Sequence, residues 1–167
     1  MALSSVPYVP KDGVILLEDA SASPIALTVA YENGDFSFGP IRQAGMSVTH
    51  FKDRGIFYSA RLNEEEPIDF SFSAHATEFA DGTEKCILDA VRGTGAFAAG
   101  DSWFGGSAEV WALRLTFSAD TSGIGGDAST VVLTYAICEC SFSEGTPGTF
   151  SVSGQAVLRS SAGVAIT

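Results

Sequence analysis

The 167-residue sequence has little charge and no long apolar run, and each shortage excludes a class of protein. Charged residues make up 17% of the chain and apolar residues 46%, the reverse of the balance in disordered proteins. No apolar stretch approaches the roughly 20 residues of a membrane-spanning helix, and the first residues lack the pattern of a secretory signal. We therefore expect one folded domain and no membrane association.

Cysteine and histidine are also scarce, which argues against disulfide frameworks and metal sites. The cysteines are Cys86, Cys138 and Cys140, an odd number, and we expect free thiols in a chain that folds in a reducing compartment. The two histidines, His50 and His75, lie in no metal-binding spacing. No nucleophile elbow or complete phosphate-binding glycine motif occurs. The expectation is a protein that is not an enzyme, with no catalytic residues, cofactor or metal.

Acidic residues dominate the charge. Twenty acids against nine bases give a net charge of −11, and such a field repels phosphate and argues against specific nucleic-acid binding. The 24 residues of Arg61–Glu84 hold seven acids and one base. Glu64, Glu65 and Glu66 precede Pro67, where we expect a solvated turn. The alternative is an acidic rim that faces a negatively charged partner.

Alternation of apolar and polar residues, typical of half-buried strands, runs through most of the chain. Ile68–His75 is the clearest case, because every second side chain is apolar. Thr130–Phe142 is apolar on both faces, which predicts a strand in the middle of a sheet or between partners. The other predicted strands are Val14–Leu17, Ile25–Tyr31, Phe36–Phe38, Met46–Phe51, Ile56–Leu62, Val110–Phe117 and Thr149–Leu158.

One segment departs from this period and predicts a short helix over about residues 83–92. Asp81 and Glu84 have the spacing of a capping box, and Gly93 can adopt the left-handed C-cap conformation. One helix among eight or nine strands predicts a mainly β fold. We expect an antiparallel β-sandwich or barrel with one short flanking α-helix.

Aromatic residues offer an alternative of another class, a carbohydrate-binding β-sandwich. Trp103 and Phe104 lie in a glycine-rich loop and Trp111 follows nearby, so the three rings could form a stacking platform for sugars. Phenylalanines at strand-periodic positions elsewhere are better explained as core.

Four stretches, in order along the chain, carry a family resemblance. They are the strand Ile25–Tyr31 with the turn Glu32-Asn-Gly-Asp-Phe, the acidic turn and alternating strand Glu65–His75, the Asp-Gly turn and helix within Phe79–Val91, and the closing strands Ala108–Phe117, Tyr135–Gly145 and Thr149–Gly154. Together they resemble the tail tube (major tail) proteins of long-tailed bacteriophages over roughly residues 25–158. Phe36–Phe57 and Gly93–Gly106 match that family poorly.

The resemblance implies a structural virion protein with one tail-tube-like domain over residues 1–167. Residues 1–13 would be a terminal arm and residues 32–55 an extended loop region. Subunits of that family form hexameric rings that stack into a tube, and DNA passes through its lumen without specific binding. The implied partners are further copies of the chain, a tape measure protein, and tail terminator and tail tip proteins. The implied location is the virion, after assembly in the host bacterial cytoplasm.

The resemblance also points to two groups of contact residues. Candidates for an acidic lumen or rim are Glu64, Glu65, Glu66 and Asp69. Candidates for contacts between rings are Asn33, Asp35, Arg42, Lys52 and Arg54. Alternatives within tail and virion biology are a capsid decoration protein, a head–tail connector and a tube of the type VI secretion kind.

Overall fold

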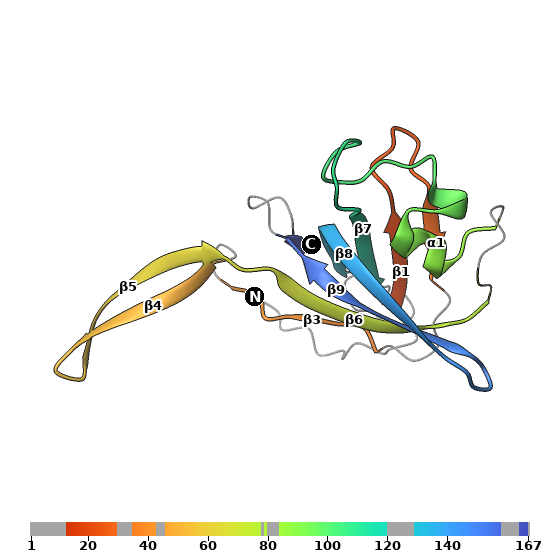
Figure 1. The fold of residues 1–167 in the computed structure, drawn as a ribbon. Helices are drawn as coiled ribbons and strands as arrows, with labels where there is room; N and C mark the ends of the chain where they lie inside the picture. The colour runs from red at the N-terminus through yellow and green to blue at the C-terminus, as the bar shows by residue number, and fades with distance from the viewer. Residues whose placement is uncertain are drawn as a thin grey trace.

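The computed structural model describes residues 13–29, 35–42, 46–77, 79, 84–119, 129–157 and 164–166. Within these residues the chain is mainly antiparallel strand with one short α-helix (Figure 1), which confirms the predicted fold class. In this part of the chain no helix has the length and apolarity needed to cross a bilayer.

Most strands belong to one sheet, in the spatial order β2-β1-β7-β8-β9-β6-β3, with β10 paired to β8. Its strands are β1 (Gly13–Glu18), β2 (Ala26–Thr28), β3 (Ser37–Gly39), β6 (Ile68–His75), β7 (Leu113–Ala119), β8 (Ser129–Ser143), β9 (Thr149–Ala156) and β10 (Val164–Ile166). The remaining two, β4 (Met46–Asp53) and β5 (Ile56–Glu65), pair only with each other and form a hairpin that extends away from the body in Figure 1.

A single apolar core joins the two ends of the sheet. Ile15 of β1 and Leu115 of β7 belong to the same buried cluster as Phe72 of β6 and Val152 of β9. Apolar side chains from the two ends therefore cover each other, as in a sandwich. The alternation of Ile68–His75 is confirmed, because its apolar residues are buried and its polar residues lie outward.

Strand β8 lies at the centre of the sheet, as its apolar sequence predicts, and a bulge explains its two apolar faces. Between the pairs Leu115–Leu133 and Leu113–Ala136, β7 advances two residues while β8 advances three. Because of this extra residue, the side chains of β8 that point into the core have odd numbers before the bulge and even numbers after it. Val131 and Leu133 are buried before the bulge, and Ala136 is buried after it.

Helix α1 (Ile87–Arg92) begins later than the sequence predicts. Its N-cap is Cys86, whose sulfur accepts a hydrogen bond from the backbone N–H of Asp89 at 3.4 Å. Asp81 of the predicted capping box lies outside the described residues and Glu84 precedes the helix, so the box does not begin α1, and the buried Cys86 marks its start instead. Gly93 ends the helix with φ 62°, which confirms the left-handed C-cap.

The region 32–55, expected as an extended loop, contains two strands among its described residues, β3 and β4. The resemblance implies a loop in this region, whereas the alternation of Ser and Thr with apolar residues predicts strand over Met46–Phe51, and the structure has the strand. Arg54 and Gly55 form the tight turn between β4 and β5, and both have positive φ, 49° and 82°. This conformation matches the twist of a two-residue hairpin.

Candidate functional site

One outward surface of the sheet carries small polar and acidic side chains. We call it the serine face. Its polar residues are Ser37, Asp69, Ser71, Ser73, Glu139, Ser141, Ser151, Ser153 and Gln155, and the apolar Ile137 lies among them opposite Gln155. Strand pairing aligns these residues on four neighbouring strands, β3, β6, β9 and β8. The alternation that buries the other side of each strand leaves this side to solvent.

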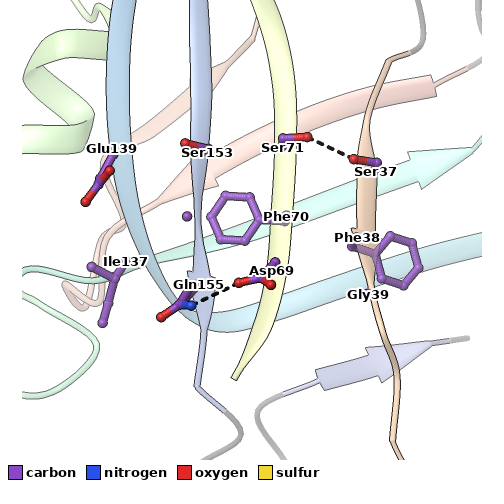
Figure 2. Close-up of a pocket in the computed structure, with 11 residues that line it drawn as sticks. Ser37, Phe38, Gly39, Asp69, Phe70, Ser71, Ile137, Glu139, Ser153 and Gln155 are labelled. Carbon is purple, nitrogen blue, oxygen red and sulfur yellow. Dashed lines mark hydrogen bonds between the residues drawn. The ribbon is translucent and has the colours of Figure 1, made fainter. Parts of the chain in front are cut away.

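A shallow concavity of about 760 Å³ lies on the serine face (Figure 2). Ser37 and Ser71 share a hydrogen bond of 2.9 Å between their hydroxyls, and Gln155 Nε2 donates to Asp69 Oδ1 at 2.9 Å. Glu139 lies opposite Ser153 on the adjacent strand. None of the residues that line the concavity is a lysine or an arginine, so its electrostatic character is acidic.

The structure separates the four residues predicted for an acidic lumen or rim. Asp69 lies on the serine face, whereas Glu64 and Glu65 are exposed residues at the end of β5. They belong to a strand and not to the predicted turn, because β5 continues to Glu65 in its pairing with β4. Glu66 follows β5 and forms an ion pair of 2.7 Å with Arg42.

The β4–β5 hairpin (residues 46–65) exposes large apolar side chains. Four of the nine exposed large apolar residues of the described chain lie on it: Val48 at 38%, Phe51 at 46%, Leu62 at 48% and Ile56 at 73% exposed. An isolated two-stranded hairpin is marginally stable in water, and clustered exposed apolar residues mark contact surfaces. The hairpin therefore has the properties of a segment that binds a partner.

The two sides of the hairpin differ in chemistry. On one side Asn63 donates hydrogen bonds to the hydroxyls of Ser47 and Thr49, and the Arg61 guanidinium lies 6.0 Å from the centre of the Phe51 ring. The other side has Val48 directly across from Leu62, with His50 across from Ala60 beside them. Both sides are exposed to solvent: the first joins its polar groups by hydrogen bonds from Asn63 and also exposes Phe51, and the second exposes the apolar pair of Val48 and Leu62.

Four of the five residues predicted for contacts between rings are described, and they fall into two pairs. Asp35 and Arg42 bind their own chain: Asp35 Oδ1 accepts a hydrogen bond of 3.1 Å from the backbone N–H of Ser73, and Arg42 pairs with Glu66. Lys52 and Arg54 are exposed at the turn of the hairpin. Asn33 lies outside the described residues.

The three aromatic residues of the alternative sugar platform are half-buried and packed against their own chain. The Arg114 guanidinium lies 5.1 Å from the centre of the Trp103 ring. Phe104 packs against Tyr135, with 5.3 Å between ring centres. The Trp111 indole lies over Gly93, where an added Cβ would come within 2.7 Å of the ring.

All three cysteines are free thiols. Burial raises the pKa of the Cys138 thiol to about 12, and the neighbouring Cys140 adds to this shift. Burial also raises the pKa of Cys86 and of Cys140. These thiols remain protonated at neutral pH, which makes them poor nucleophiles and poor metal ligands. Among the described residues no three His, Cys, Asp or Glu side chains gather as a metal site.

Two parts of these surfaces were not predicted from the sequence. Glu139 joins Asp69 on the serine face only through the pairing of β8, β9 and β6. The outward alternation of Glu139 and Ser141 was a usable signal, but the bulge in β8 obscured its phase. For Val48 and Leu62 the alternation predicts strand, but it does not indicate that this side of the hairpin is exposed.

Comparisons with known proteins add a likeness of fold. No protein-family model matches the sequence, and no curated protein sequence does. Among solved structures, the chain is similar to the sheath/tube terminator of an extracellular contractile injection system, PVC, in its extended state. The TM-score is 0.52 at 10% identity, and the likeness covers 99% of both chains. At this identity it concerns the fold alone, which the two chains share from end to end.

Proposed function

We propose that this chain is a structural subunit of a phage tail or of a tail-like injection particle, and that it is not an enzyme. The observation that carries the proposal is the likeness of fold to a sheath/tube terminator over 99% of both chains. The ordered resemblance of residues 25–158 to tail tube proteins, found from the sequence alone, points to the same class of particle.

Within that class, the finer proposal is a tube subunit that forms hexameric rings, which stack into the conduit for DNA. The serine face supports this role, because a wall of serines with Asp69 and Glu139 and no cation in its concavity repels phosphate. We assign this face to the lumen. Of the four residues predicted there from the sequence, only Asp69 belongs to it.

The exposed hairpin supports self-assembly. Its apolar residues, Ile56 above all, would lose contact with water when subunits meet. The proposed partners are further copies of the chain, a tape measure protein in the lumen during assembly, and terminator and tip proteins at the ends. The proposed location is the tail of the virion or of a tail-like particle.

A second candidate is a terminator, which the likeness to the PVC protein specifically favours. From a protein that ends a tube we expect rings that do not stack, whereas a tube subunit adds ring upon ring. Negative-stain electron microscopy of the purified protein, dilute and then concentrated, separates the candidates. Stacked rings with a central hole support the tube subunit, single rings at every concentration support the terminator, and monomers throughout contradict both.

A further inference from the structure

The β4–β5 hairpin carries charges of opposite sign at its two ends. Lys52 and Arg54 are exposed at the turn, while Glu64 and Glu65 are exposed at the base, where β5 leads back to the body. Within the described part of the chain, none of these four residues takes part in an ion pair. Both ends therefore have charges available for a partner.

The turn is basic in an otherwise acidic protein. Residues 50–61 hold three of the nine bases and one of the twenty acids, Asp53. The remaining residues hold six bases and nineteen acids, so another copy of the chain is an acidic surface for this turn. Opposite potentials of this kind guide association and fix the register of an interface.

The basic side chains at the turn cannot reach the acidic side chains at the base of the same hairpin. The eight residues of β4 span about 25 Å at roughly 3.3 Å per residue, which keeps the basic turn far from the acidic base of the same hairpin. Between these ends lies the exposed apolar pair of Val48 and Leu62. Any contact between turn and base therefore joins two molecules.

We propose that the turn of one copy's hairpin binds the base of the hairpin on a neighbouring copy. Lys52 and Arg54 then face Glu64 and Glu65 of the neighbour, and the apolar pair Val48–Leu62 is covered between them. In the proposed arrangement the turn of each copy binds the base of the next copy, whose own turn binds a third, so the contact is head-to-tail and repeats from copy to copy. This inference rests on the proposed function, since it requires a chain that assembles with itself.

Charge reversal at each end provides the test. One variant reverses the turn (Lys52→Glu with Arg54→Glu), and another reverses the base (Glu64→Lys with Glu65→Lys). A matched control, Glu109→Lys with Glu144→Lys, makes the same change in net charge as the base variant at exposed sites outside the hairpin. The dissociation constant for self-association is measured by sedimentation equilibrium, and circular dichroism and urea unfolding report on folding.

We expect self-association to weaken in each variant alone and to recover when the two variants are mixed. Each variant alone should self-associate about tenfold or more weakly than the unaltered protein, because like charges then face each other. An equimolar mixture should recover to within about threefold, since each reversed turn meets a reversed base. The control should associate as the unaltered protein does, and all variants should remain folded.

The outcomes separate this contact from the proposed function. If the unaltered protein assembles but the mixture associates no better than either variant alone, the turn-to-base contact is wrong and the assembly function stands. The contact is equally wrong if the control weakens association as much as the base variant. If the unaltered protein stays monomeric at every concentration, the proposed function itself is contradicted, together with the contact.

Discussion

Phe70 lies directly across the β6–β9 pair from Gly154, and its buried ring occupies the space that a side chain at Gly154 would need. An added Cβ would come within 2.7 Å of the ring and still closer to the carbonyl oxygen of Ile137. The glycine therefore leaves room for the Phe70 ring, which packs in the core on the other side of the sheet from the serine face.

Substitution of Gly154 should reveal this close packing. We expect Gly154→Ala to lower the free energy of unfolding by about 1–3 kcal/mol, because the methyl group forces Phe70 or the strand backbone to move. Urea unfolding measures the change. Ser153→Ala, an exposed neighbour on the same strand, should change stability by less than about 0.5 kcal/mol. Equal effects of the two substitutions would contradict the packing argument.

The buried carboxylate of Asp19 should be a strong structural anchor. It accepts hydrogen bonds from the backbone N–H of Ile25 at 2.6 Å, from the backbone N–H of Asp101 at 3.0 Å and from the Ser21 hydroxyl. Asp19→Ala should cost about 2–4 kcal/mol of stability in urea unfolding, since backbone donors lose their acceptor in the interior. Asp101→Ala is the control, because that side chain is exposed and only its backbone donates. An Asp19→Ala variant that is as stable as the Asp101→Ala control would contradict this role.

Stability should fall in alkaline solution because of Cys138. Its pKa is raised from 9.0 to about 12 in the folded chain, so the unfolded chain loses the proton first as pH rises. The stabilisation is complete below about pH 9 and declines between 9 and 12, by up to about 1.4 kcal/mol per pH unit. Urea unfolding at pH 8, 9 and 10 should show a steeper decline than in Cys138→Ala, in which other ionising groups are unchanged. Parallel declines in the two proteins would contradict this assignment.

Charge on the serine face should control binding of DNA to the assembled particle. Asp69→Lys combined with Glu139→Lys should make the particles retain DNA at about 50 mM salt and release most of it by about 200 mM, as expected for phosphate contacts. Co-sedimentation with DNA measures this retention. The unaltered protein and the Glu109→Lys, Glu144→Lys control should not retain DNA. Variant particles that ignore DNA at low salt would remove the lumen assignment.

Removal of the β4–β5 hairpin should separate folding from assembly. Met46 and Glu65 are paired across its base, so an Asn-Gly turn can replace residues 47–64. Because β4 and β5 pair only with each other, we expect the melting temperature to change by less than about 4 °C. Self-association, measured by sedimentation, should be lost. A shortened chain that does not fold would show that the hairpin belongs to the folding unit.

Much of the strand architecture could be predicted from the sequence, because alternation with period two is a local signal. The inward and outward residues of Ile68–His75 follow directly from it. The left-handed cap at Gly93 was equally accessible, since glycine favours that conformation. The start of the helix could not be predicted in this way, because a thiol such as that of Cys86 is a weak capping signal and the burial of Cys86 determines where the helix begins.

The functional surfaces depend on contacts that no local pattern contains. Asp69 and Glu139 share a face through two strand pairings between distant parts of the chain. For the hairpin, alternation predicts strands but does not say which side a core will cover, and here the body covers neither Val48 nor Leu62. The register of β8 required knowledge of its bulge.

A cryo-electron microscopy reconstruction of the assembled particle tests the central claim most directly. We predict closed rings around a hole, with the serine face of every copy directed to the channel and the carboxylates of Asp69 and Glu139 on its wall. Rings in which this face is buried between subunits, or directed to the outside, would contradict its assignment to the lumen.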